Sequence, residues 1–293
     1  TTINSKEKVS VAKKRWGLLA KALQSPTQLT THLDKISLRR FSSYTLIESN
    51  RLLQDVNKSI HEEWYEYTAR FDENHAYSVL ICHPKRTFTP AELSGFNNTG
   101  NICIWPSEET LAYYSLSNPN IFAGRTVLEL GGGMSCLAGL MIATHLNSVC
   151  VHLTDGNATA VDNVYRSIKN NIPKNNCLIS CSVLKWNRNE NIKDIIPYDI
   201  IICADCLFFD EYRIDLIETI WNRLTDNGIA LAMAPNRGNT LQEFLIEAKF
   251  KGFYVKKMYY YNKRVWDRHV SLLDNPDYNE DIHYPILLQL TKK

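Results

Sequence analysis

Residues 127–136 read Val-Leu-Glu-Leu-Gly-Gly-Gly-Met-Ser-Cys. An apolar run that ends in glycines predicts a buried strand followed by a tight turn. The turn holds Gly131, Gly132 and Gly133, and Glu129 stands two residues before the first of them. Glycine lets a backbone approach a ligand closely, and the N-terminus of a helix after such a turn faces that ligand. The stretch therefore predicts a strand–turn–helix unit of the nucleotide-binding kind.

Apolar runs alternate with helix-like segments on the C-terminal side of Arg125. The expected strands are Thr126–Leu130, Val149–Leu153, Leu178–Leu184, Tyr198–Cys203, Ile229–Ala234, Phe253–Tyr261 and Ile286–Leu290, and the expected helices are Ser135–Leu146, Asn157–Asn170, Glu211–Leu224 and Leu241–Phe250. Strands separated by helices of this length are typical of a parallel, doubly wound sheet. We therefore expect an α/β fold with a Rossmann-like sheet of seven strands.

The first 120 residues follow a different pattern, which predicts an N-terminal α+β accessory region. Its expected elements are a basic helix over Val9–Leu23, strands over Ile36–Ile47 and Tyr77–Cys82, and a helix over Glu108–Leu116 that Ser107 caps. The residues Asn118-Pro119-Asn120 mark a tight junction. We expect an accessory region over residues 1–120 and a catalytic domain over residues 121–293.

The composition excludes several classes of protein. The chain has 293 residues, and a hydrophobic fraction of 44% indicates a sizeable core. A net charge of +2 gives no overall attraction to nucleic acid. No apolar run approaches the roughly 20 residues that a membrane-spanning helix needs. We expect a monomer that binds neither nucleic acid nor a membrane.

The cysteines and the charges give two further expectations. Eight cysteines lie mostly in apolar segments, which is typical of a reducing compartment, so we expect a cytoplasmic protein with the nucleus as a second compartment. Residues 1–40 hold nine Lys or Arg against two acidic residues, whereas the rest of the chain is net acidic. A basic N-terminal segment predicts docking of an acidic partner, although charge runs are more often solvated faces.

A second carboxylate supports a nucleotide site. Asp155 ends the second expected strand in H-L-T-D-G, where it can accept hydrogen bonds from both hydroxyls of a ribose. The dinucleotide motif G-x-G-x-x-G would need a third glycine where Cys136 stands. The pattern E-L-G-G-G instead resembles the first motif of class I methyltransferases that use S-adenosylmethionine. The alternative is a plain strand–helix junction whose glycines serve only close packing.

Further motifs narrow the resemblance. They are W-P-S-E-E-T-L-A-Y-Y at residues 105–114, L-T-D at 153–155, L-K-W at 184–186 and A-D-C-L-F at 204–208. Together they resemble the seven-β-strand methyltransferase family 16, whose members methylate protein lysines. The resemblance implies that both tryptophans lie against S-adenosylmethionine, with Trp186 and Ala204 beside the adenine. The expected cofactor-binding residues are Trp105, Glu129, Gly131, Gly132, Gly133, Asp155, Asn157, Trp186 and Ala204, and we expect no metal site.

Two residues are expected to face the methyl acceptor. Asp205-Cys206-Leu207-Phe208 matches the D-x-x-Y motif of that family, with Phe in place of Tyr. We expect Asp205 to orient the amine and Phe208 to line its channel, without a phenolic base. Asp205 can alternatively cap the following turn. Cys203 and Cys206 form C-x-x-C, but no second pair suits zinc, so buried thiols at a strand end are the simpler interpretation.

Longer blocks, from about Trp16 to the C-terminus, resemble the members of this family that methylate calmodulin. The resemblance implies calmodulin as the protein substrate and methylation up to trimethyl-lysine. One alternative is a lysine of another protein. A second is a non-catalytic module, because the basic segment Ala12–Leu23 has an apolar stripe like that of helices that bind calmodulin.

Overall fold

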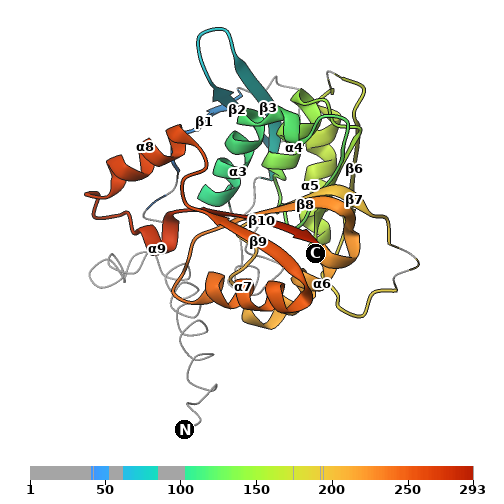
Figure 1. Cartoon of the computed structure of the whole chain (residues 1–293). Helices are drawn as coiled ribbons and strands as arrows, with labels where there is room; N and C mark the ends of the chain where they lie inside the picture. The colour runs from blue at the N-terminus through green and yellow to red at the C-terminus, as the bar shows by residue number, and fades with distance from the viewer. Residues whose placement is uncertain are drawn as a thin grey trace, which may run out of the picture.

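A computed structural model describes residues 41, 43–52, 62–84, 103–173, 175–191, 193 and 195–292. The expected basic helix and the first residues of the expected strand Ile36–Ile47 lie outside these ranges. The described chain forms two sheets, one of three strands and one of seven, with helices between them and below the larger one (Figure 1).

The seven-stranded sheet confirms the predicted fold class. Its strands are β4 (Thr126–Glu129), β5 (Cys150–Asp155), β6 (Leu178–Val183), β7 (Tyr198–Ala204), β8 (Leu224–Ala234), β9 (Phe253–Met258) and β10 (Ile286–Lys292). They lie in the order β6-β5-β4-β7-β8-β10-β9, with β10 antiparallel to both its neighbours and the other pairs parallel. The strand order reverses between β4 and β7. Ligands of open α/β sheets bind at the carboxyl ends of the strands at such a reversal.

Helices cover both faces of this sheet, as a doubly wound fold requires. On one face lie α3 (Pro106–Ser117), α4 (Leu137–His145) and α5 (Ala158–Lys169), and on the other lie α6 (Arg213–Arg223) and α7 (Thr240–Lys251) (Figure 1). Residues 137–144 of α4 are all buried, because the helix packs against the large sheet on one side and the small sheet on the other. The expected helix Ser135–Leu146 is therefore present as α4.

The small sheet is an antiparallel meander of β1 (Ile47–Arg51), β2 (Glu62–Arg70) and β3 (Ala76–Pro84). Polar side chains of α5 and of Asn171 just after it, spaced four residues apart, bind the free edge of β3. Asn171 exchanges two hydrogen bonds with the backbone of Leu80, at 2.8 and 2.7 Å. Ser167 accepts from the Cys82 N–H at 3.1 Å, and Asn163 donates to the Cys82 carbonyl at 2.6 Å. These bonds satisfy an edge that would otherwise be open to pairing, and they fix the small sheet to α5.

An insertion between β9 and β10 was not predicted from the sequence. It contains α8 (Lys263–Leu272) and α9 (Glu280–His283), and the expected strand Phe253–Tyr261 ends at Met258 before it. The insertion is anchored by an aromatic cluster in which the Tyr44 hydroxyl lies 2.9 Å from that of Tyr278. The cluster joins the start of the accessory region to the end of the chain.

Three local predictions are wrong. The described part of Ile36–Ile47 becomes a strand only at Ile47, because the backbone N–H groups of residues 44, 46 and 47 donate to the Glu109 carboxylate instead of to a neighbouring strand. Helix α3 starts at Pro106 and Trp105 is its N-cap, so Ser107 does not cap it. Strand β8 begins at Leu224, before the expected start at Ile229, and its pairing with β7 is irregular between these two residues.

One hydrophobic core runs through both sheets. It includes Leu46 and Val79 of the accessory region together with Leu128 and Ile201 of the large sheet. Because this core includes residues on both sides of residue 120, the division of the chain into two regions at that point stays a prediction. None of the helices in the described ranges is long and apolar enough to cross a membrane.

Candidate active site

The glycine turn lies at the carboxyl end of β4, beside the reversal of strand order. Gly131 and Gly133 have φ values of +63° and +61°, a left-handed conformation that favours glycine. The Gly132 N–H donates to the Thr154 carbonyl at 3.0 Å, so the turn is tied to the end of β5. The predicted strand–turn–helix unit is present, although α4 begins only at Leu137.

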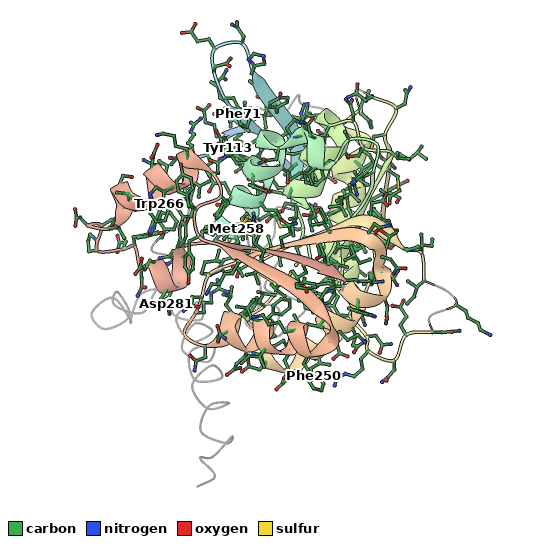
Figure 2. All side chains as sticks on the ribbon, in the orientation of Figure 1. Phe71, Tyr113, Phe250, Met258, Trp266 and Asp281 are labelled. Carbon is green, nitrogen blue, oxygen red and sulfur yellow. The ribbon has the colours of Figure 1, made fainter. Side chains whose placement is uncertain are left out.

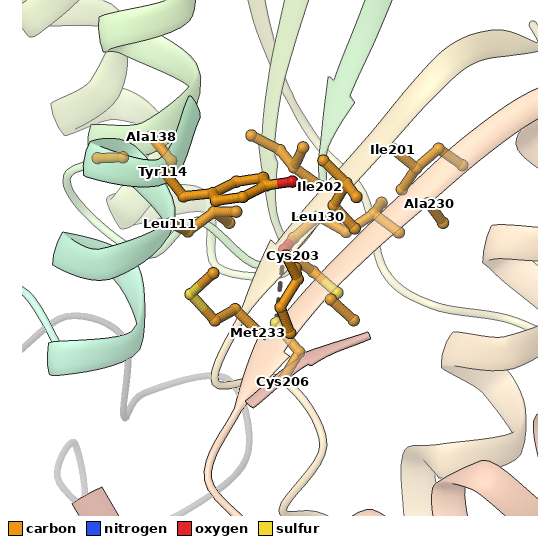
Figure 3. Packing of buried hydrophobic residues seen from close by; sticks show 14 of the residues in the cluster. Leu111, Tyr114, Leu130, Ala138, Ile201, Ile202, Cys203, Cys206, Ala230 and Met233 are labelled. Carbon is orange, nitrogen blue, oxygen red and sulfur yellow. Dashed lines mark hydrogen bonds between the residues drawn. The ribbon is translucent and has the colours of Figure 1, made fainter. Parts of the chain in front are cut away.

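Side chains of the protein itself fill the space that the glycines leave open. A Cβ on Gly131 would lie 2.9 Å from Cys206 Sγ and 3.0 Å from the Trp186 ring, and one on Gly132 would lie 2.4 Å from Cys136 Sγ. Figure 3 shows Cys206 beneath the loop, where its thiol donates to the Leu130 carbonyl at 3.5 Å. The glycines therefore let Trp186 pack directly on the turn, where the sequence predicts the adenine wall.

Asp155 lies at the end of β5, next to the turn. One carboxylate oxygen accepts from the Gly133 N–H at 2.9 Å and the other from the Asn157 N–H at 2.8 Å. Burial raises the pKa of this carboxyl group above its ordinary value. A carboxylate has about four acceptor sites, so each oxygen keeps one for a further donor such as a ribose hydroxyl.

Two more carboxyl groups are buried beside the turn. Glu129 accepts from the Gly139 N–H at 3.2 Å. Glu108, on α3, accepts from the Ser135 hydroxyl at 2.5 Å and from the Leu137 N–H at 2.8 Å. The N-cap residue of α4 makes no side-chain cap, so Glu108 supplies one from the neighbouring helix. The sequence placed Glu108 only at the N-terminus of its own helix.

Burial makes these two groups hold their protons strongly. It raises the pKa of Glu129 to about 8, and the nearby charge of Glu108 adds to that rise. It raises the pKa of Glu108 to about 7, against the opposing effect of its hydrogen bonds. Three carboxyl groups, those of Glu108, Glu129 and Asp155, thus surround the turn, and among the described residues no cation forms a hydrogen bond with them. Such a site suits a ligand that carries positive charge, and S-adenosylmethionine carries it on both sulfonium and amine.

The other predicted cofactor residues occupy the same edge of the sheet. Asn157 is the N-cap of α5, and its side chain accepts from the N–H groups of Thr159 and Ala160 at 2.8 and 3.3 Å. The Trp105 carbonyl accepts the first N–H groups of α3. Ala204 is the last residue of β7. The contacts of Asn157, Trp105 and Ala204 with the cofactor stay predictions.

Asp205 follows β7 and is bound by a partner that the sequence did not suggest. Its φ is +56°, its exposed fraction is 8%, and its N–H donates to the Met233 carbonyl at 2.8 Å. The Arg237 guanidinium binds both carboxylate oxygens, at 2.6 and 2.7 Å. Planar bidentate pairs of this kind are the strongest ion pairs in proteins.

Phe208 lies on the other side of the same guanidinium. The guanidinium carbon of Arg237 is 5.4 Å from the centre of the half-buried Phe208 ring, which is within the range of a cation–π contact. The ring of Phe209 lies 4.0 Å from that of Phe208. The two predicted acceptor residues are therefore brought together by Arg237.

The sequence did contain a signal for Arg237. It stands in A-P-N-R-G, directly after the expected strand Ile229–Ala234. Parallel strands present their carboxyl ends to one edge, so a charged residue there was a candidate for the site. The signal was weak because its partner is 32 residues earlier in the chain.

Helix α9 fixes the loop that carries Arg237. The Asp281 carboxylate accepts from the Asn236 side chain at 2.9 Å and from the Gly238 N–H at 2.8 Å, and its carbonyl accepts from the Arg237 N–H at 2.6 Å. His283, two residues further, has its pKa lowered by burial and by the charge of Arg237. The insertion thus contributes directly to the site.

Tyr113 of α3 connects three parts of the molecule. Tyr113 is buried and stacks on Phe71 at 4.6 Å with the ring planes 9° apart (Figure 2). Arg264 lies 5.5 Å from the same ring. Tyr113 therefore joins α3 to the small sheet and to α8.

The buried C-x-x-C thiols agree with the simpler interpretation of that motif. Cys203 and Cys206 are 2% and 8% exposed, and all eight cysteines are free. Within the part of the chain that the structure describes, no group of three His, Cys, Asp or Glu side chains is arranged to hold a metal ion.

The strand order, the glycine turn and the carboxylate at the end of β5 define a methyltransferase of the S-adenosylmethionine-dependent class. Residues 91–250 match the sequence model of the lysine methyltransferase family, and the chain belongs to this family.

Two relatives in sequence agree with this assignment. A calmodulin-lysine N-methyltransferase from Arabidopsis thaliana is 31% identical over 293 residues, which cover 95% of this chain and 96% of the relative. The protein N-lysine methyltransferase METTL21A from Xenopus tropicalis is 27% identical over 157 residues, or 54% of this chain and 70% of the relative. Among solved structures, the CcbJ methyltransferase from Streptomyces caelestis has a TM-score of 0.46 and 12% identity over 64% of this chain and 90% of its own.

Proposed function

We propose that the protein methylates a lysine of calmodulin, up to trimethyl-lysine, with S-adenosylmethionine as the methyl donor. The observation that carries the proposal is the 31% identity to a calmodulin-lysine N-methyltransferase, which extends over 95% of this chain. Similarity to METTL21A covers only 54% of the chain, so it supports the shared chemistry more than a shared target.

The residues around the glycine turn fit the methyl donor. S-adenosylmethionine, when bound, supplies a methyl group on a cationic sulfonium and is left as S-adenosylhomocysteine. Asp155 has acceptor sites free for the ribose hydroxyls, and Trp186 offers a flat wall for the adenine. The buried carboxyl groups of Glu108 and Glu129 compensate the positive charge.

The residues after β7 are proposed to hold the acceptor lysine. Only the neutral amine attacks a methyl group, and burial of the lysine in a narrow channel lowers its pKa. Asp205 orients the amine, whose proton leaves to water. The Phe208 face accommodates the more diffuse charge of a methylated ammonium, so mono- and dimethyl-lysine remain substrates. Phe208 has no hydroxyl and cannot act as a base.

A basic surface supports an acidic protein partner such as calmodulin. The segment Lys249–Arg268 holds seven Lys or Arg against a single acidic residue. The C-terminal end of β9 lies at the carboxyl edge of the sheet, because β9 runs parallel to β8, and Lys256 and Lys263 are exposed there. The basic residues 1–40 lie outside the described residues, as does the expected calmodulin-binding segment. A monomeric protein of the cytoplasm and nucleus is part of the proposal.

Mass spectrometry of calmodulin incubated with the protein and S-adenosylmethionine tests the proposal. We expect additions of one, two and three methyl groups, all on one lysine. Methylation of a different protein, with none on calmodulin, would replace calmodulin as the target. Calorimetry with S-adenosylmethionine alone checks the chemistry, since a non-catalytic module that only binds calmodulin would give no heat of binding.

A further inference from the structure

A lysine methyltransferase that places a carboxylate beside its acceptor meets a conflict of charge. The carboxylate can orient the amine, but an opposite charge within about 4–6 Å stabilises the protonated form and raises the pKa of the lysine by 1–3 units. A protonated amine has no lone pair for the methyl group. The conflict concerns Asp205, the only predicted acidic residue on the acceptor side of the site.

Arg237 resolves this conflict in the described structure. Its guanidinium binds both oxygens of the Asp205 carboxylate, at 2.6 and 2.7 Å, and Asp205 is 8% exposed. Both residues have left-handed backbones, with φ values of +56° and +44°. Non-glycine residues adopt this conformation at a cost of order 1–3 kcal/mol, and such conformations cluster at functional sites. The pair is therefore held in place rather than formed by chance.

Besides Asp205, two residues fix the position of Arg237: Asp281 and Phe208. Asp281 of α9 fixes the neighbouring Asn236 and Gly238 with its carboxylate and the Arg237 N–H with its carbonyl. The Phe208 ring lies 5.4 Å from the guanidinium carbon. A guanidinium with so little freedom keeps its charge at one place while a substrate enters.

We propose that Arg237 is a positioning residue that cancels the charge of Asp205 toward the acceptor amine, so that the carboxylate can fix the geometry of a lysine that is able to lose its proton. The inference rests on the proposed transfer of methyl groups to lysine at this site. Arg237 itself is assigned no contact with the reacting atoms.

The other titratable groups around the pair do not replace Arg237. Asp281 and His283 face it from α9, Cys206 lies on its own loop, and the charge of Asp155 reaches that thiol from the end of β5. The pKa of His283 is lowered by burial and by Arg237, so the imidazole is neutral near pH 7. Removal of Arg237 therefore leaves two carboxylates near the acceptor, and His283 is then the one group of this set that can carry positive charge, at a pH below its pKa.

The test is the pH dependence of kcat/KM for calmodulin methylation in Arg237→Gln. We expect the acidic limb of the profile to move up by about one pH unit, while the affinity for S-adenosylmethionine stays within twofold. In Asp205→Asn/Arg237→Gln, which lacks both charges, the limb returns to the wild-type position although turnover remains low. Lys251→Gln is the matched control, since its 2.6 Å pair with Glu218 lies at the far end of α7.

An unchanged limb in Arg237→Gln would overturn the inference and leave Arg237 as a purely structural residue. If the wild-type protein does not methylate calmodulin, the proposed substrate is wrong. The titration of His283 by NMR then shows whether the charge of Arg237 acts in the pocket. We expect His283 in Arg237→Gln to titrate at a higher pH than in the wild type. An unshifted His283 would also overturn the inference, because the charge of Arg237 would then not reach the pocket.

Discussion

The two halves of the candidate active site use the same edge of one sheet but are built from different kinds of contact. On the cofactor side, backbone N–H groups of a glycine turn donate to the side chain of Asp155 and to the carbonyl of Thr154. On the acceptor side, the charged side chains of Asp205 and Arg237 bind each other across 32 residues of chain, and the Asp281 carboxylate holds the loop of Arg237 by accepting from the Gly238 N–H across 43 residues. The cofactor side depends on backbone conformation, and the acceptor side on compensated charge.

This difference predicts how each half responds to mutation. A side chain that binds backbone donors can be removed at the cost of a few hydrogen bonds. One charge of a buried pair cannot be removed without leaving the other unpaired, which is far more disruptive. Loss of Asp155 should therefore weaken cofactor binding moderately, whereas loss of Asp205 should disable methyl transfer.

The largest effect is expected for Asp205→Asn. Asparagine tolerates the left-handed backbone of this position but cannot bind the Arg237 charge, so the acceptor amine loses its fixed orientation. We expect turnover on calmodulin to fall by about 100-fold, the loss typical of a misplaced reactant, with cofactor affinity nearly unchanged. Single-turnover kinetics with saturating S-adenosylmethionine measure it.

Asp226→Asn is a matched control for charge, because the carboxylate of Asp226 is 95% exposed and its ion-pair partner among the described residues is Lys292, at 3.4 Å. Full turnover in a folded Asp205→Asn would make Asp205 a turn residue and would erase the distinction between the two halves.

The next largest effect is expected for Asp155→Ala. The substitution removes the acceptor of the Gly133 N–H and the acceptor sites proposed for the ribose. Loss of hydrogen bonds to a charged group suggests a weakening of about 1.5–3 kcal/mol in S-adenosylmethionine binding. Calorimetric titration gives this number directly. Asp162→Ala, on the exposed face of α5, should bind as the wild type does. Unchanged affinity in a folded Asp155→Ala protein would rule out Asp155 as the ribose ligand.

The same contrast explains which parts of the molecule the sequence predicted. The places of Gly131, Gly133 and Asp155 in the fold were predicted, because these residues belong to motifs that lie next to the strands that present them, and their contacts with the cofactor stay predictions. The seven strands followed from hydrophobic alternation for the same reason. The roles of Arg237 and Asp281, and the capping of α4 by Glu108 of α3, were not predicted, since each depends on a partner in another element. Insertion α8–α9 was missed although Asn262 caps α8, because the contact that ties the insertion to the accessory region joins Tyr278 to Tyr44, 234 residues earlier in the chain.

A third prediction concerns the buried carboxyl groups of the cofactor side. The pKa of Glu129 is about 8 in the folded protein, against an ordinary value near 4.5. Between these pH values the folded state binds the proton more tightly than the unfolded state, so stability falls as the pH rises. The slope is at most about 1.4 kcal/mol per pH unit for one such group.

Glu129→Gln removes this contribution. We expect the free energy of unfolding of the variant, relative to the wild type, to increase steadily from pH 5 to pH 8 in urea denaturation. Saturating S-adenosylmethionine should flatten the slope of the wild type, since a bound cation stabilises the charged carboxylate. A difference that is constant with pH would mean that Glu129 is ionised in the folded protein, and that the cofactor side compensates charge as the acceptor side does.

The smallest effect is expected for the basic surface beyond the acceptor side. Lys256→Gln/Lys263→Gln removes two exposed charges near the carboxyl edge of the sheet. Lys249→Gln removes one exposed charge near the C-terminal end of α7. Exposed charges mainly set the encounter rate, and salt screens them beyond about 8 Å at physiological ionic strength. We expect the double variant to raise the KM for calmodulin a few-fold at low salt and hardly at all at high salt, without a change in kcat. The matched control, Lys249→Gln, should leave KM unchanged at either salt concentration. Equal effects of the two variants would mean that the whole basic segment attracts calmodulin. The lysines near the acceptor side would then form no docking surface of their own.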